Sequence, residues 1–220
     1  MRPPVAESRW AARSTRAREL AAARPEARDA LEFLERLTTL QLALATQYRS
    51  ADAALPRYLD WLAVSAPAPI AEAATRITTM PVDPSVDGAE AFILEALLQV
   101  FPPDPCPYCK APVVSLLREA AHGSRRSQVC GVCLTESPAP RLGCAACGEQ
   151  RVEVLPIFRS DATEPARIDA CDTCRAYVKT IDLTRDAGAC PIADDLASVS
   201  LDLWAREQGY TRARLNLLRL

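Results

Sequence analysis

Histidine and glycine are scarce in this 220-residue sequence, and each scarcity excludes a class of catalytic site. The single histidine, His122, lies between Ala121 and Gly123, where we expect a solvated loop. A zinc hydrolase built on a histidine pair is therefore excluded, and a catalytic triad that contains histidine could use only His122. With 7 glycines and no glycine-rich loop motif, a phosphate-binding loop is excluded as well.

Long apolar segments are also missing. The uncharged stretch from Leu37 to Tyr48 has 12 residues, too few to cross a bilayer. Charged residues continue from the N-terminus to Asp29, so the apolar core of a signal peptide is not visible there. We therefore expect a cytoplasmic protein with no stable membrane insertion, and in that compartment paired cysteines favour metal over disulfides.

The charge balance gives little electrostatic attraction toward nucleic acid. The formal net charge is −2 at pH 7, and residues 106–190 carry 11 basic and 10 acidic side chains. A phosphate-binding surface needs clustered lysine and arginine. We therefore expect no nucleic-acid partner.

Cysteine is the abundant reactive residue type, with nine residues in the chain. Eight of the nine form four Cys-x-x-Cys pairs, which are Cys106/Cys109, Cys130/Cys133, Cys144/Cys147 and Cys171/Cys174. Two intervening residues let one tight turn direct both sulfurs at one point, and two such turns supply the four thiolates of a tetrahedral metal site. We expect the ninth, Cys190, to be a plain thiol.

The spacing of the pairs predicts two consecutive four-cysteine modules. The gaps between successive pairs are 20, 10 and 23 residues. Each of the two longer gaps is long enough for a short β segment that leads from one cysteine turn to the turn that completes the same site. The modules would then run over residues 106–143 and 144–190. A cross-braced arrangement, in which the first pair joins the third and the second joins the fourth, remains the alternative.

Four thiolates at tetrahedral corners close the coordination shell of zinc or iron and leave no position for water. Such a site is structural or transfers electrons, and it is not a hydrolytic centre. The sequence therefore predicts no catalytic residues, and the ligands alone do not distinguish iron from zinc. Glycine follows the second cysteine of one pair, at Gly148, whereas Lys110, Leu134 and Arg175 hold the other three equivalent positions.

The residues before the cysteines predict a helical domain over residues 1–105. Helix-forming residues fill positions 5–23, Pro25 suits a first helical position, and leucines then recur every three or four residues up to Tyr48. We expect Pro56 to break this pattern, loops at 65–69 and 81–88, and another apolar helix over 89–101. The run Pro102-Pro103-Asp104-Pro105 then marks the domain boundary.

The sequence after Pro105 predicts an α+β fold overall. Short valine-rich and aromatic segments alternate with turns between the cysteine pairs, as expected for the arms of metal-binding hairpins. Residues 191–220 return to a helix and a tail. In that helix we expect Asp194 and Asp195 to cap the positive end, Leu203 to lie on the apolar face, and Gly209 to end it.

Taken together, these motifs resemble those of the formate dehydrogenase accessory protein family, FdhE. The resemblance covers most of residues 106–210 and rests on order and spacing as well as on the motifs themselves. The matching segments are Cys-Pro-Tyr-Cys at 106–109, Cys-Gly-Val-Cys-Leu-Thr-Glu at 130–136, Cys-Ala-Ala-Cys-Gly at 144–148, Arg-Ile-Asp-Ala-Cys-Asp-Thr-Cys-Arg-Ala-Tyr-Val-Lys at 167–179, Ala-Asp-Asp-Leu-Ala-Ser at 193–198 and Leu-Asp-Leu-Trp-Ala-Arg-Glu-Gln-Gly-Tyr at 201–210.

The resemblance implies an α-helical domain followed by two rubredoxin-like modules that hold iron, with zinc as the alternative metal. It implies a non-enzymatic maturation factor of the cytoplasm, which binds the molybdenum-containing catalytic subunit of respiratory formate dehydrogenase before twin-arginine export. The metal-ligand role carries over to the eight paired cysteines. Two other functions stay open, a zinc-ribbon module for nucleic acid or a translation partner and a rubredoxin-like electron carrier.

Overall fold

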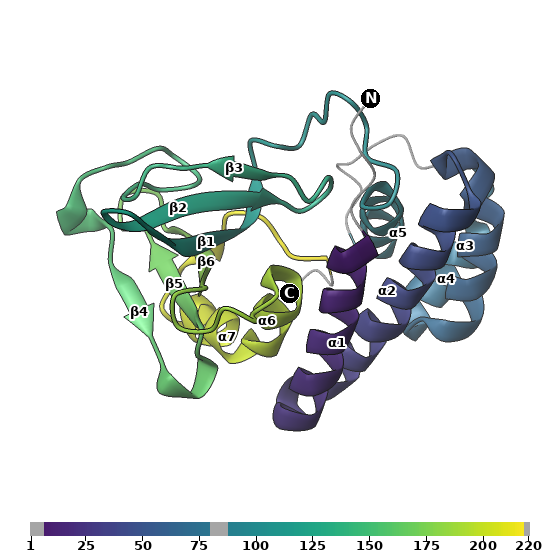
Figure 1. Cartoon of the computed structure of the whole chain (residues 1–220), viewed down its shortest axis with the longest axis horizontal. Coiled ribbons are helices and arrows are strands. Elements are labelled where there is room, and N and C mark those ends of the chain that lie inside the picture. Colours follow the sequence, from purple (N-terminus) through teal and green to yellow (C-terminus); the bar gives the residue numbers. More distant parts are fainter. Residues whose placement is uncertain (1–6, 80–87, 218–220) are drawn as a thin grey trace.

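The computed structural model describes residues 7–79 and 88–217. The first half of the chain is helical, and its helices lie together on one side of the molecule (Figure 1). They are α1 (Glu7–Ala23), the short 3-10 helix η1 (Pro25–Ala27), α2 (Arg28–Gln47), α3 (Ala51–Ser65), α4 (Ala68–Arg76) and α5 (Ala89–Leu98).

Helix α2 follows its predicted pattern. Pro25 opens the turn η1 before it, at a position where the missing amide is not needed. The leucines spaced by three and four residues are buried, so that α2 packs one continuous apolar face against its neighbours. These buried leucines are Leu31, Leu34, Leu37, Leu40 and Leu44.

The expected break at Pro56 is wrong, because Pro56 lies inside α3. The helix begins earlier, after Ser50, whose hydroxyl accepts a hydrogen bond from the Ala53 amide at 3.3 Å. Pro56 falls on the solvent side, so the hydrogen bond that it omits is lost where water is available. The predicted loop at 65–69 contains the start of α4 at Ala68, and most of the loop predicted at 81–88 lies outside the described residues.

The second half forms one sheet that spans both cysteine modules. Its order is β3-β2-β1-β6-β5-β4, with β7 paired to β6. The strands are β1 (Pro112–Ala120), β2 (Gly123–Cys130), β3 (Glu136–Pro138), β4 (Ile157–Arg159), β5 (Ala166–Ala170), β6 (Ala176–Asp182) and β7 (Thr211–Arg212). The modules join where β1 pairs in parallel with β6, with Val114 opposite Lys179. The α+β class is confirmed, while the division of residues 106–190 into two domains stays a prediction.

The predicted C-terminal helix is two helices, α6 (Pro191–Ala197) and α7 (Val199–Glu207), which meet at Ser198. The Ser198 hydroxyl donates back to the Asp194 carbonyl at 2.8 Å, a contact that competes with the regular helix. Leu203 is 55% exposed, so its predicted place on the apolar face is wrong, and Leu201 is buried instead. Gly209 follows α7 at φ 77°, as expected of a residue that ends a helix.

The helical half and the sheet share one hydrophobic core. Buried side chains of α1 and α2 belong to the same cluster as those of β1, β6 and α6. Within this contact, Arg16 of α1 donates to the buried Asp194 of α6 at 2.6 Å. In Figure 1, α1 lies beside α6, whereas β4 and β5 lie at the side of the sheet away from the N-terminal helices α1–α5 and next to α7.

Candidate metal centres

The structure gathers the eight paired cysteines into two groups of four. The first group holds Cys106, Cys109, Cys130 and Cys133, and the second holds Cys144, Cys147, Cys171 and Cys174. Within each group all four sulfurs lie within 4.8 Å of one another. The grouping is therefore sequential, as the spacing predicted, and the cross-braced alternative is not the arrangement found.

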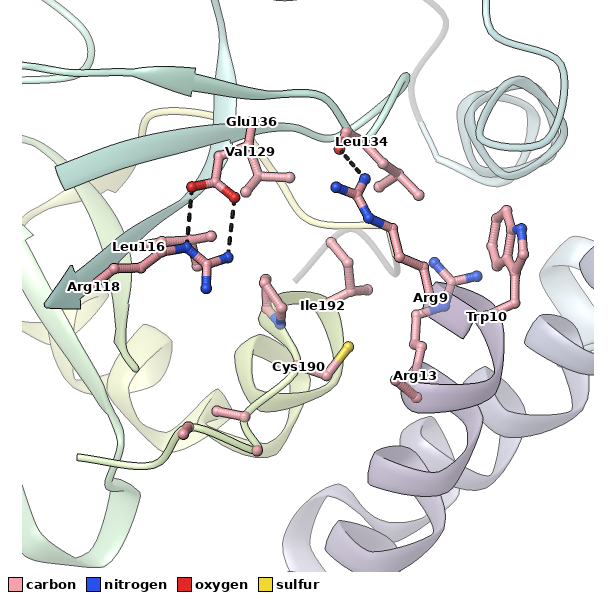
Figure 2. Close-up of a pocket in the computed structure, with 15 residues that line it drawn as sticks. Arg9, Trp10, Arg13, Leu116, Arg118, Val129, Leu134, Glu136, Cys190 and Ile192 are labelled. Carbon is pink, nitrogen blue, oxygen red and sulfur yellow. Dashed lines mark hydrogen bonds and ion pairs between the residues drawn. The ribbon is translucent and has the colours of Figure 1, made fainter. Parts of the chain in front are cut away.

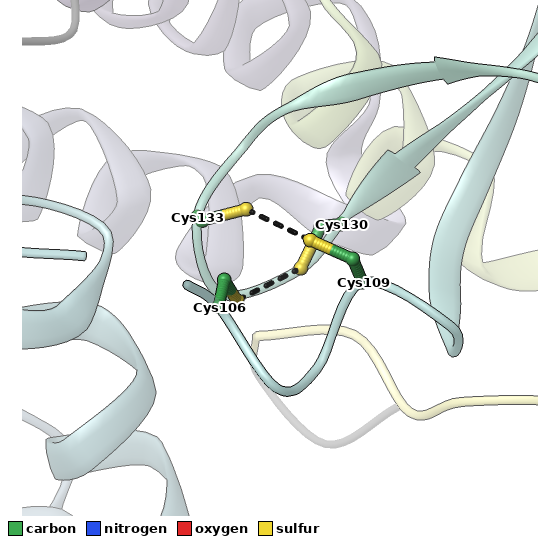
Figure 3. Close-up of side chains that lie close together, drawn as sticks. All are labelled: Cys106, Cys109, Cys130 and Cys133. Atoms are coloured by element: carbon green, nitrogen blue, oxygen red, sulfur yellow. Dashed lines mark hydrogen bonds between the residues drawn. The ribbon is translucent and has the colours of Figure 1, made fainter. Parts of the chain in front are cut away.

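The sulfur distances fit a four-thiolate metal ion. In the first group Cys106 and Cys130 are 4.0 Å apart at their Sγ atoms, and Cys109 and Cys133 are 3.5 Å apart (Figure 3). The corresponding distances in the second group are 3.6 Å and 3.8 Å. With metal–sulfur bonds of roughly 2.3 Å, the corners of a tetrahedron lie about 3.8 Å apart. All eight are free thiols, so each group can offer four donors to one ion.

The turn that begins at Cys144 uses the backbone to direct its first sulfur inward. In the turn from Cys144 to Gly148, the Gly148 amide donates to the Cys144 carbonyl at 3.1 Å. The amides of Ala146 and Cys147 point at the Cys144 Sγ, at 3.3 Å and 3.4 Å. Amides that donate to sulfur stabilise the thiolate, which is the form that binds metal.

The residue after the second cysteine adopts a left-handed conformation in three of the four turns. Gly148 has φ 76°, Leu134 has φ 54° and Arg175 has φ 57°. A side chain at positive φ costs roughly 1–2 kcal/mol, which glycine avoids. Two turns therefore bear that cost, and Lys110 is not among the positive-φ residues of the described chain.

The thiols of the first group differ in acidity because burial and hydrogen bonding act on them unequally. Burial raises the pKa of Cys106 far above its ordinary value. At Cys133 burial also favours the neutral thiol, but hydrogen bonds from Thr135 outweigh it and lower the pKa to about 6. Four neighbouring thiols cannot all ionise without a compensating charge, and a bound cation supplies that charge. The donor set therefore suits a divalent or trivalent ion.

Residues of the helical half contact the first cysteine group and hold its second turn in place. Gln99, just after α5, donates from Nε2 to the Gly131 carbonyl at 2.8 Å, inside the turn that carries Cys130 and Cys133. Its Oε1 accepts from the buried Arg13 of α1 at 2.9 Å. Leu98 packs against the same turn. The first centre therefore lies in the joint between the helices and the sheet.

The second group is held by its own turns, the sheet and the C-terminal segment. Thr173 donates to Glu149 at 3.1 Å, which links the two turns directly. The Arg175 guanidinium stacks on the Tyr210 ring at 3.9 Å and donates to the Gln208 carbonyl at 2.5 Å. These contacts attach the centre to the segment after α7.

His122 and Cys190 lie outside both groups. His122 occupies the exposed turn between β1 and β2, as expected. Cys190 is half-buried and lines a cavity of about 370 Å³ between α1 and the sheet, with Leu116, Ile192 and Arg9 among its other walls (Figure 2). Burial raises the pKa of the Cys190 thiol, which keeps it neutral at physiological pH.

The sequence did not reveal a buried charge cluster between strands β6 and β7 and helices α6 and α7. It consists of Lys179, Arg212, Asp195 and Asp202, whose side chains are at most 2% exposed. Asp194 does cap α6, accepting from the Cys190 amide at 2.7 Å, but Asp195 turns inward to Lys179 and Arg212. The available signal was a lysine in the middle of an otherwise apolar strand, β6.

None of the helices in the described ranges has the length and apolar character that a membrane crossing requires.

Comparison with known proteins shows what the C-terminal part is similar to. Residues 142–219 match the family model described as "FdhE, C-terminal domain". A "Protein FdhE homolog" from Aquifex aeolicus (strain VF5) is 39% identical over 116 residues, which are 51% of this chain and 41% of that protein. The homolog from Haemophilus ducreyi is 32% identical over 113 residues, which are 50% of this chain and 36% of that protein. The match thus spans less than half the length of either relative.

The crystal structure of the FdhE protein from Pseudomonas aeruginosa extends the likeness to the whole chain. It superposes with a TM-score of 0.74 over 99% of both chains, at 23% sequence identity. At this identity the superposition shows a shared fold. Together with the family match, it confirms the resemblance that the cysteine motifs indicated.

Proposed function

Residues 142–219 match the FdhE C-terminal domain, and from that match we propose that this chain is a non-enzymatic accessory factor for a respiratory formate dehydrogenase. It binds the catalytic subunit of that enzyme in the cytoplasm, before export, and supports its activation. The observation that carries the proposal is the pair of four-thiolate groups, each with the spacing of a closed metal site. Because a closed site has no position for water, it suits an accessory role better than hydrolysis.

The eight paired cysteines are the proposed metal ligands, and iron is the proposed metal, with zinc as the alternative. Bound iron would supply a one-electron couple that is accessible without a change of ligands. The chain itself orients the thiolates through backbone amides, as at Cys144, and excludes water from Cys130 and Cys133 by packing. Visible colour after anaerobic purification and reoxidation distinguishes iron from zinc, since ferric tetrathiolate absorbs strongly and zinc does not.

Affinity capture tests the proposed partner. The tagged chain is expressed in its native host, under conditions in which the formate dehydrogenase catalytic subunit is shown to be present, and bound proteins are identified by mass spectrometry. We expect that subunit to be enriched over a capture from a strain that lacks its gene. Capture of ribosomal or nucleic-acid machinery in its place would contradict the proposal and favour the zinc-ribbon alternative.

A further inference from the structure

We propose that the two centres divide their roles: the first is a fixed structural joint, and the second is an exchangeable centre with Cys147 and Cys174 as its accessible edge. This inference rests on the proposed metal binding and deepens it. It follows from a difference in burial, in supporting contacts and in position within the fold.

Burial separates the two groups. In the first, Cys130 and Cys133 are each 3% exposed, and Cys106 and Cys109 are half-buried. In the second, Cys147 and Cys174 are exposed, and Cys171 alone is fully buried. Two corners of the second tetrahedron therefore face solvent, whereas the first has no comparably open edge.

Supporting contacts separate them as well. Three separate parts of the chain hold the turn that follows Cys130. Gln99 bonds the Gly131 carbonyl, and Arg9 of α1 donates to the Leu134 carbonyl at 3.3 Å. A Cβ at Gly131 would lie 3.3 Å from Val113 Cβ and 3.4 Å from Arg214 Nε, so this turn is closely packed. Opening the first centre would therefore disturb α1, the α5 end and the C-terminal segment together.

The second centre has a lighter support at its open edge. A hydrogen bond between the exposed Thr173 and the half-buried Glu149 links its two turns. Arg175, next to Cys174, is held by the carbonyl of Gln208 and the ring of Tyr210. Thr173 and Arg175 are exposed at this edge, the Tyr210 ring beneath Arg175 is 7% exposed, and Figure 1 places β4 and β5 on the side away from the helical half. Local opening of this edge costs few buried contacts.

The geometry therefore points to ligand exchange at the Cys147–Cys174 edge. Cys147 and Cys174 are the thiolates that an incoming donor atom would displace from a bound ion, and the displaced thiolate would take up a proton from water. The oxidation state of the metal does not change in this step. At the first centre the same step requires a donor to reach past Tyr108 and Leu98, which pack against the cysteines there.

Metal release and thiol labelling test this division on the full chain loaded with zinc. A chromophoric chelator in excess should remove one zinc per chain at least roughly tenfold faster than the other, since access governs the reaction. Brief alkylation with iodoacetamide, mapped by mass spectrometry during the fast phase, should modify Cys147 and Cys174 before Cys130 and Cys133.

Paired variants identify the phases. Cys147→Ser with Cys174→Ser should abolish the fast phase and keep the slow one, and Cys106→Ser with Cys109→Ser should abolish the slow phase. If the variant Cys106→Ser with Cys109→Ser fails to fold, the order in which the cysteines of the unaltered chain are labelled still tests the proposed division. A single release rate for both zinc ions, or labelling of Cys106 and Cys109 as fast as Cys147 and Cys174, would overturn the division of roles but not the metal-binding proposal. A chain that takes up no zinc would overturn the metal-binding proposal with it.

Discussion

Lys179 Nζ lies 2.6 Å from Asp202 Oδ2, and the two side chains are 0% and 2% exposed. Arg212 donates to the other carboxylate oxygen of Asp202 at 2.9 Å, and the Tyr177 hydroxyl donates to it at 2.7 Å. Asp195 completes the cluster, 3.0 Å from Lys179. Two cations thus balance two carboxylates in the interior. The cluster fastens α6 and α7 to β6 and β7.

Asp202→Asn should destabilise the protein by about 3–5 kcal/mol, because it leaves buried cations without their partner. The exposed pair Arg18–Glu35 offers a matched control, since one of its side chains is 66% exposed. Arg18→Ala should cost no more than about 1 kcal/mol. Both are measured by denaturant unfolding of the metal-loaded protein. An equal, small loss in the two variants would mean that the buried cluster contributes no more than a surface pair.

The adjacent carboxylates Asp194 and Asp195 should affect acid stability in opposite directions. At Asp195 burial favours the neutral form, but Arg212 and Lys179 outweigh it and hold the pKa below its ordinary value of 3.8. The stability that Asp195 contributes is therefore present above its unfolded pKa and lost as pH falls through its folded pKa. At Asp194 burial outweighs Arg16 and raises the pKa above 3.8. Its contribution is present below its unfolded pKa and lost as pH rises through its folded pKa.

Unfolding free energies from pH 7 to pH 3 check these signs. Asp195→Asn should make the acid loss shallower below pH 3.8, and Asp194→Asn should make it steeper just above pH 3.8, each relative to the unaltered chain. Acid also protonates the metal-binding thiolates, but that effect is common to all three proteins. Parallel pH profiles for the two variants would contradict the assignment.

Gln99→Leu should loosen the first centre selectively. It leaves the Gly131 carbonyl without its hydrogen bond and the buried Arg13 without one of its acceptors, at a cost of roughly 2–3 kcal/mol. Zinc release from the slow centre should then accelerate about tenfold or more, as is typical when an outer-shell support is removed. The matched variant Thr173→Val removes a support of the second centre and should leave the slow phase unchanged. The idea fails if Gln99→Leu accelerates the fast phase instead.

At Arg175, glycine should be better tolerated than alanine. Both substitutions remove the contacts with Gln208 and Tyr210, so their difference isolates the cost of a side chain at φ 57°. Arg175→Gly should be more stable than Arg175→Ala by about 0.5–1 kcal/mol in thermal or denaturant unfolding. In the middle of α2, the exposed Glu32 provides the control, because there glycine should be less stable than alanine by about 1 kcal/mol. The same order at both positions would argue against strain in the turn.

Local patterns were enough to predict the helices and the metal-binding turns. The repeat of leucines in α2 and the two-residue cysteine spacing are each set by neighbours in the sequence, so the chain displays them directly. The continuity of α3 through Pro56 was not predictable in this way, since it depends on which side of the helix meets water.

Long-range pairing could not be read from the sequence. The parallel contact of β1 with β6 joins residues such as Val114 and Lys179, and no local signal specifies that register. The inward turn of Asp195 depends on that same pairing, because it needs Lys179 and Arg212 already in place. A pair of acidic residues near a helix start is equally consistent with capping, which describes Asp194 and not its neighbour.

The metal content of the purified chain tests the central claim most directly. Protein prepared without oxygen or chelators is analysed by plasma mass spectrometry, alongside the variants Cys106→Ser with Cys109→Ser and Cys147→Ser with Cys174→Ser. The two four-sulfur groups predict two metal ions per chain, and one ion in each folded variant. A folded chain that holds no metal, or whose metal content is the same after either pair of substitutions, would contradict the assignment of both centres.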